Sequence, residues 1–281
     1  MFLKFMYITN DPEVAKIAQK YGVDRVWVDL ETLGKEERQG HIDSVKSHHS
    51  IADIKRIVPV LDKSEMLVRV NPLNSHSQEE IEQVIEAGAD MIMLPMWKSL
   101  SDVKTFLSYA DGRVKTTLLL ETKEAFECVD EVLAYGGVDE IHIGLNDLHL
   151  SYGLNFMFEL LANGKVEELC KKIKAAGIPY GFGGIAKIGE GAVPAEKIMM
   201  EHYRLGSTRA ILSRSFCNYE KMDSLTDVDV TFARNMEAIK NFEKKIEAMD
   251  EQDFLQNKLQ LKYDIATVAN SIAAKKQKMA V

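Results

Sequence analysis

The sequence lacks the features that mark disulfide-rich secreted proteins and metal-thiolate proteins. Only three cysteines occur in 281 residues, Cys128, Cys170 and Cys217, and their spacing is not that of metal ligands. An odd number of widely separated cysteines does not form a disulfide framework and suits a reducing compartment. We interpret all three as buried or inert thiols.

Long apolar runs and basic clusters are also missing. No apolar run reaches the roughly 18 residues of a membrane-spanning helix, and the chain becomes polar at residues 9–12, before a signal-peptide pattern develops. The net charge of −8 comes without a basic stripe, which argues against nucleic acid or an anionic membrane as a partner. We therefore expect a cytoplasmic protein that acts on small molecules.

What the chain does have is a regular alternation of short apolar runs and amphipathic stretches. Eight strand-and-helix units in series predict a (β/α)₈ TIM barrel, because alternation of this kind implies a parallel sheet. A doubly wound sheet is the alternative, but the dinucleotide fingerprint is absent and acidic residues follow several strands, which favours the barrel. The expected strands are residues 3–8, 25–31, 67–72, 89–95, 115–121, 139–144, 178–184 and 209–214.

Two successive strands are followed by carboxylates. Glu121 ends one expected strand, and Asp147 comes shortly after the next. Parallel neighbours lie about 4.8 Å apart, so both acids could reach one hard cation and leave its other positions to water and substrate oxygens. A single acid at such a position more often caps the following helix, but the pair favours a metal site.

Further charged residues end the second and third strands. Asp29 and Glu31 stand two apart and therefore point to the same face, and Arg69 ends the third strand. The planar guanidinium of Arg69 suits a carboxylate or enolate oxygen. A structural ion pair with Asp29 or Glu31 is the alternative, and the two roles are compatible.

Three other segments carry candidate ligand-binding groups. Residues 32–49 form a long polar loop with His41, His48 and His49, although a loop histidine is more often merely solvated, and Lys35 and Arg38 could make it an anion site instead. Gly183 and Gly184 close strand seven, and Arg214 closes strand eight. Such exits often hold phosphate in this fold, and a simple turn is the equal alternative.

The C-terminal part differs from the rest. Apolar residues recur every three or four positions in residues 232–249, and less regularly in 263–272, which predicts two amphipathic helices beyond the barrel. We divide the chain into a catalytic barrel, residues 1–219, and a helical extension, residues 220–281. We expect the extension to form a homo-oligomer, and packing on its own barrel is the alternative.

With these residues assembled, the chain resembles the HpcH/HpaI aldolase and citrate lyase family from the first strand to about residue 217. Each motif is weak alone, but five in the family's order at predicted strand ends are strong evidence for the fold. They are Asp29-Leu30-Glu31, Val68-Arg69-Val70-Asn71, Gly88-Ala89-Asp90 with Pro95, Glu121-Thr122-Lys123-Glu124-Ala125 and Ile143-Gly144-Leu145-Asn146-Asp147-Leu148.

The resemblance implies a class II aldolase, a metal-dependent carbon–carbon lyase. Glu121 and Asp147 would hold Mg²⁺ or Mn²⁺, and Arg69 would contact a pyruvate-like 2-oxo acid that reacts through an enolate with an aldehyde-like acceptor. We place Asp29 and Glu31 beside Arg69 or metal-bound water. The alternatives are a lyase acting on a CoA thioester, an enzyme using phosphoenolpyruvate, and a non-catalytic binding member of the family.

Two positions depart from the family pattern. Thr32 stands where many of its aldolases carry a catalytic histidine, and Leu119 replaces a common glutamine two residues before the metal-binding glutamate. A metal-bound hydroxide or one of His41, His48 and His49 in the following loop could transfer the proton instead, and we select His41. No lysine lies at a predicted interior strand end, which disfavours Schiff-base chemistry.

Overall fold

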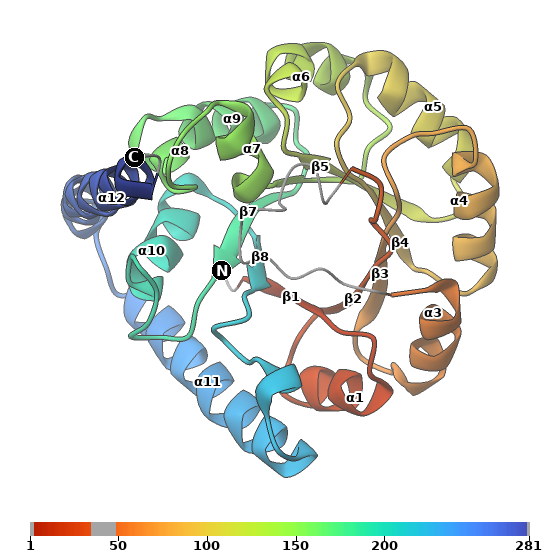
Figure 1. Cartoon of the computed structure of the whole chain (residues 1–281), viewed down its shortest axis with the longest axis horizontal. Helices are drawn as coiled ribbons and strands as arrows, with labels where there is room; N and C mark the ends of the chain where they lie inside the picture. The colour runs from red at the N-terminus through yellow and green to blue at the C-terminus, as the bar shows by residue number, and fades with distance from the viewer. Residues whose placement is uncertain (1–2, 35–48, 280–281) are drawn as a thin grey trace.

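The computed structural model describes residues 3–34 and 49–279, and these residues form a closed barrel of eight parallel strands surrounded by helices (Figure 1). Each strand pairs with the next in the sequence, and β8 pairs with β1 to close the sheet. The predicted (β/α)₈ barrel is therefore confirmed. The strands are β1 (Lys4–Ile8), β2 (Arg25–Asp29), β3 (Glu65–Arg69), β4 (Met91–Leu94), β5 (Lys115–Leu120), β6 (Glu140–Ile143), β7 (Tyr180–Ile185) and β8 (Arg209–Leu212).

Several of the helices around the barrel begin at polar residues that helix termini favour. Asp11 accepts hydrogen bonds from two backbone N–H groups at the start of α1, and Ser99 forms a capping box with Asp102 at the start of α5. The helices are α1 (Pro12–Lys20), α3 (Ile51–Ile57), α4 (Ser77–Glu86), α5 (Leu100–Ala110), α6 (Lys123–Tyr135), α7 (Leu145–Ser151), α8 (Glu159–Ala162), α9 (Lys165–Ala175) and α10 (Ala195–Leu205).

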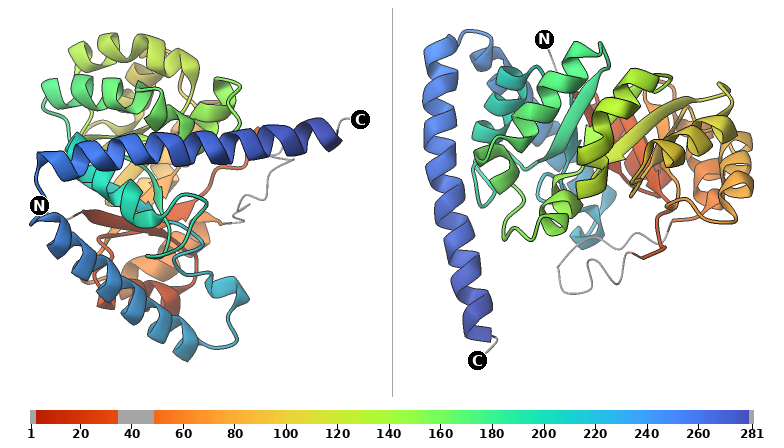
Figure 2. Two further views of the ribbon diagram at one scale, coloured as in Figure 1. Left: turned by 90° about the vertical axis from the view of Figure 1, so that its left-hand side faces the viewer. Right: turned by 90° about the horizontal axis from the view of Figure 1, so that it is seen from above.

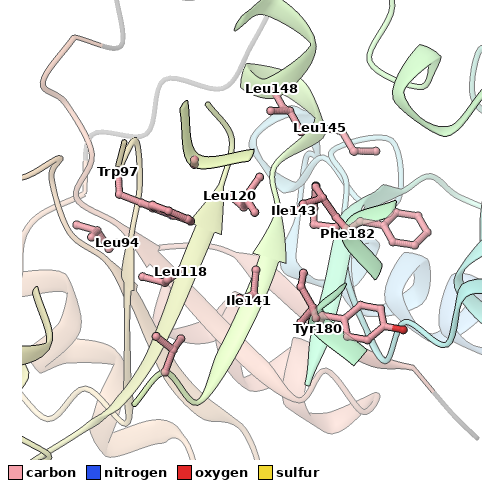
Figure 3. Close-up of a cluster of buried hydrophobic side chains, with 14 of the residues drawn as sticks. Leu94, Trp97, Leu118, Leu120, Ile141, Ile143, Leu145, Leu148, Tyr180 and Phe182 are labelled. Atoms are coloured by element: carbon pink, nitrogen blue, oxygen red, sulfur yellow. The ribbon is translucent and has the colours of Figure 1, made fainter. Parts of the chain in front are cut away.

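Alternate strand residues face the helices or the barrel interior. Leu118 and Leu120 of β5, with Ile141 and Ile143 of β6, belong to the apolar layer between strands and helices (Figure 3). The residues between them therefore point inward. The interior core contains Leu119 and further apolar side chains, namely Met6, Trp27, Leu67, Met91 and Met93.

The N-terminal end of the barrel is closed by a network of ion pairs. Arg25 binds Glu140 at 2.6 Å and Glu65 at 2.8 Å, and Arg209 binds the second oxygen of Glu140. These groups are paired with one another and belong to the scaffold. Reactive groups are consequently to be sought at the opposite, C-terminal end of the strands.

The two helices predicted beyond the barrel are present as α11 (Leu225–Ile246) and α12 (Glu251–Met279). α11 packs on the barrel through buried Phe232, whose ring centre lies 4.9 Å from that of Tyr7. α12 lies against α8 and α10 and then runs past the barrel (Figure 2). The boundary at residue 219 and the role of the extension in assembly stay predictions. Among the described residues, no helix is both long and apolar enough to span a membrane.

Candidate functional site

Six of the residues predicted for the site line one cavity of about 210 Å³ at the C-terminal end of the strands. β2, β3 and β5 bring their acidic or basic residues to it, α7 brings an acid in its first turn, and β7 brings two glycines. Apolar side chains complete the wall. The six predicted residues are Asp29, Arg69, Glu121, Asp147, Gly183 and Gly184.

Glu121 lies between the backbone segments that follow β4 and β6, the two strands next to its own. Its Oε1 accepts a hydrogen bond of 3.1 Å from the N–H of Met96, just after β4. Met96 has a φ of 53°, a left-handed conformation that costs a non-glycine residue roughly 1–3 kcal/mol. On the other side, a Cβ at Gly144 would lie 2.9 Å from both Cβ and Oε2 of Glu121, so only glycine fits beneath this carboxylate.

Glu121 and Asp147 are both buried, and their charges oppose each other. Burial raises the pKa of Glu121 well above its usual range, the charges of Asp147 and Glu31 raise it further, and Arg69 lowers it. A divalent cation between the two carboxylates would relieve both the desolvation and the repulsion. The pair therefore fits a metal site.

The chemistry of the donors also suits the predicted ion. Carboxylate oxygens are ligands of hard cations such as Mg²⁺ and Mn²⁺. Within residues 3–34 and 49–279, no group of three histidine, cysteine or acidic side chains is placed to hold a metal. Two protein ligands would leave the remaining positions to water and substrate, as is usual for Mg²⁺.

Arg69 is fixed by both acids of the second strand's end. Its Nε and Nη2 donate to the two carboxylate oxygens of Asp29, each at 2.8 Å, and its Nη1 lies 3.1 Å from Oε2 of Glu31. Burial acts to lower the pKa of Arg69, but Asp29 and Glu31 outweigh it and raise the pKa, so the guanidinium stays charged. The structural ion pair that the sequence left as an alternative is present, with both acids.

Of the three histidines in the loop after β2, the structure describes His49. His41 and His48 lie outside the described residues. His49 accepts a 3.0 Å hydrogen bond at Nδ1 from the backbone N–H of Asp29. It lines a second cavity of about 170 Å³, which adjoins the first along Ile8 and Ile211.

Arg214 and Thr32 lie away from the first cavity. β8 ends at Leu212, two residues earlier than predicted, and Arg214 lines the second cavity instead. The backbone N–H of Thr32 donates to Oδ1 of Asn71 at 2.9 Å. Thr32 thus ties the exits of β2 and β3 together.

Two interior residues that the sequence analysis did not select also line the first cavity, Trp27 and His142. Both are buried, and neither the indole Nε1 nor Nδ1 of His142 has a hydrogen-bond partner among the described residues. The available signal was their parity. Side chains two residues apart on a strand point to the same side. Trp27 stands two residues before Asp29, and His142 stands two residues before Gly144, so both could have been expected to point inward.

Comparisons with known proteins agree with this architecture. The family model described as HpcH/HpaI aldolase/citrate lyase matches residues 4–177. No curated protein matches the sequence significantly.

Solved structures share the fold at low identity. An HpcH/HpaI aldolase from Desulfitobacterium hafniense DCB-2 has a TM-score of 0.60 and 16% identity, over 85% of this chain and 93% of the other. A HpcH/HpaI aldolase/citrate lyase family protein from Burkholderia cenocepacia J2315 has a TM-score of 0.62 and 14% identity, over 81% of this chain and 95% of the other. A variant of the citrate synthase SbnG has a TM-score of 0.55 and 15% identity, over 75% of this chain and 85% of the other.

Proposed function

The chain belongs to the HpcH/HpaI aldolase/citrate lyase family, and from this we propose that it is a divalent-metal-dependent aldolase. It would form or cleave a carbon–carbon bond to a pyruvate-like 2-oxo acid. The observation that carries the proposal is the convergence of Glu121, Asp147 and Arg69 on one buried cavity. Two acids suited to a hard cation beside an arginine match a substrate that carries a carboxylate next to a ketone.

Each residue has a distinct part in this proposal. Glu121 and Asp147 would hold Mg²⁺ or Mn²⁺, which when bound supplies a Lewis acid for the 2-oxo group and stabilises the negative charge that develops there. The guanidinium N–H groups of Arg69 that Asp29 and Glu31 do not engage would bind the substrate carboxylate. Those two acids would keep the guanidinium from rotating, and the apolar walls would exclude water.

The same arrangement suggests where the acceptor enters. The second cavity adjoins the first along two apolar side chains, Ile8 and Ile211. An aldehyde bound there would lie next to a 2-oxo acid bound at Arg69. Gly183 and Gly184 would let the reacting carbons lie close to the backbone of β7, since neither residue has a side chain.

The assay is solvent exchange of the pyruvate methyl protons in D₂O, which requires an enolate but no acceptor. We expect the methyl signal to disappear with Mg²⁺ or Mn²⁺ and to persist with EDTA, with Glu121→Ala and with Asp147→Ala. Exchange that survives EDTA would overturn the metal assignment. Pyruvate binding without exchange would instead indicate a binding protein.

One observation favours the alternative of a phosphate-bearing or CoA-linked substrate. A groove of about 490 Å³ follows the second cavity and shares Arg214, Cys217 and Asn218 with it. Three further cationic side chains line it, Lys187, Lys221 and Arg234, and no described acidic side chain does. In a chain of net charge −8, such a groove suits an anionic group.

Paired aldehyde acceptors with and without a phosphate would test this alternative. If the groove binds the anion, Arg234→Ala should raise the KM for the phosphorylated acceptor and leave pyruvate exchange unchanged. An equal KM in variant and parent would remove the groove from the substrate site.

A further inference from the structure

His142 lies in the floor of the candidate site. It stands on β6 and pairs in register with Leu119 of β5, one inward-facing position below Glu121. Two residues further on, just after β6, Gly144 faces Glu121 and Leu119 and has no side chain, so no side chain of β6 stands between the imidazole and the mouth of the barrel. The ring lines the same cavity as the predicted metal ligands and Arg69.

The contacts of the imidazole fix its tautomer. Nε2 lies 3.2 Å from the carbonyl oxygen of Gly183. A carbonyl oxygen can only accept, so Nε2 carries the proton and Nδ1 keeps an unshared electron pair. Nδ1 is buried and has no hydrogen-bond partner among the described residues. His202 on α10 also has a buried ring nitrogen without a partner, Nε2, but His202 does not line the cavity. An unsatisfied buried polar atom is costly, and at His142 it belongs to a ring that forms part of the cavity wall, where a ligand would supply the missing partner.

The surroundings keep this electron pair available. Burial lowers the pKa of His142 to about 4, Arg25 and Arg209 add to the effect, and Glu140 opposes it. The imidazole is therefore neutral near pH 7. The charge of Glu140 and the hydrogen bond between Nε2 and the carbonyl of Gly183 favour the imidazolium that forms transiently.

We propose that His142 is the proton-transfer residue of this site, an inference that rests on the proposed aldolase function. In the cleavage direction, Nδ1 takes the proton of the C4 hydroxyl of a 4-hydroxy-2-oxo acid. The C3–C4 bond then breaks, the hydroxyl oxygen becomes the carbonyl oxygen of the released aldehyde, and the bonding pair passes to C3 as the enolate. Nδ1 returns the same proton to C3, so that pyruvate leaves and the histidine is again neutral.

The other described histidine near the substrate path is arranged differently. His49 already accepts a hydrogen bond at Nδ1 from the backbone N–H of Asp29. Its Nε2 then carries the proton, so His49 presents a donor to its surroundings. Among the described histidines, only His142 lines the first cavity, and its unprotonated nitrogen has no hydrogen-bond partner there.

The first test compares His142→Gln with a matched variant, His202→Gln. A glutamine at 142 can still donate to the carbonyl of Gly183 but cannot act as a base. His202 is equally buried but lies on α10, where its ring stacks on Phe182 and its Nδ1 is 2.7 Å from the hydroxyl of Ser207. We expect pyruvate exchange to fall by at least about 100-fold in His142→Gln and to be unchanged in His202→Gln, with oxalate affinity and Tm retained in both.

A second test uses the parent protein alone and so does not depend on whether a variant folds. In the parent labelled with ¹⁵N-histidine, the His142 Nδ1 resonance should be that of an unprotonated nitrogen and should shift when oxalate is added with Mg²⁺. A protonated Nδ1, an Nδ1 indifferent to oxalate, or normal exchange in His142→Gln would overturn the role of His142 alone. Absence of exchange in the parent, despite pyruvate binding, would overturn the proposed function together with it.

Discussion

At the scale of single residues, Arg69 shows how a binding group is held ready. Asp29 engages two of its nitrogens and Glu31 the third, and its guanidinium carbon lies 5.2 Å above the centre of the Trp27 ring. Each contact restricts rotation of the side chain. A ligand carboxylate would therefore meet an ordered guanidinium, which lowers the entropy cost of binding.

Arg69→Lys tests this arrangement. The charge survives the change but the planar fork does not, so the bidentate contact with Asp29 is lost together with one to the ligand. We expect oxalate to bind at least about 10-fold more weakly in the presence of Mg²⁺, since hydrogen bonds to charged groups contribute roughly 1.5–3 kcal/mol. Calorimetric titration measures the affinity.

Arg113→Lys is the control, because Arg113 forms an exposed pair with Glu82 far from the cavity. It should bind oxalate as the parent does. Equal affinities in parent and Arg69→Lys would remove Arg69 from the substrate site.

At the scale of elements, Glu167 of α9 connects three helices. Its carboxylate lies 2.8 Å from Nζ of Lys258 on α12 and 3.1 Å from Nη2 of Arg204 on α10. The hydrogen bond from Lys258 lowers the pKa of Glu167 to about 2, with Lys171 and Arg204 contributing in the same direction. Because the folded-state pKa is below the unfolded value, this contribution to stability is present at neutral pH and is lost as the pH falls from about 4.5 towards 2.

We therefore expect α12 to loosen from the barrel in that acidic range before the barrel unfolds. Glu167→Gln should loosen α12 partly even at pH 7. It should lower the free energy of opening α12 by on the order of 1 kcal/mol, because the ion pairs are partly exposed. Amide hydrogen exchange of α12, compared with that of β5, is the measurement. Glu168→Gln is the control, since Glu168 pairs with Lys172 on its own helix. Identical exchange of α12 in both variants would contradict the prediction.

At the scale of the whole molecule, α12 carries one apolar face inward and another outward. Leu261, Ile265 and Ala269 are buried and belong to the core cluster. Leu255, Leu259 and Tyr263 recur every fourth residue and are 49%, 73% and 69% exposed. A stripe of this kind on a helix that runs past the barrel (Figure 2) suits a second copy of the chain.

We expect a homo-oligomer in which this stripe is buried. Leu259→Asp should shift the sedimentation coefficient of the parent towards that of the monomer, because burying an unpaired carboxylate is costly. Leu225→Asp, at an exposed apolar position of α11, should leave the sedimentation coefficient unchanged. A monomeric parent would contradict the prediction.

The sequence by itself determined the barrel and the residues at its C-terminal end. Both depend on local information, namely the alternation of apolar residues within a strand and the polar residue that follows it. Glu121 and Asp147 could be placed near each other because they follow adjacent parallel strands, whose separation is fixed by backbone hydrogen bonding. The helices of the extension were equally readable, since their periodicity is local.

Only the tertiary structure decided which side chains complete the site. Arg69 binds both Asp29 and Glu31, although either pair alone was compatible with the sequence. The tautomer of His142 depends on a carbonyl of β7, where the register with β8 shifts between Gly181 and Gly184. Such contacts join residues about 40 positions apart, and their geometry follows from the curvature and register of the closed sheet, which no local pattern encodes.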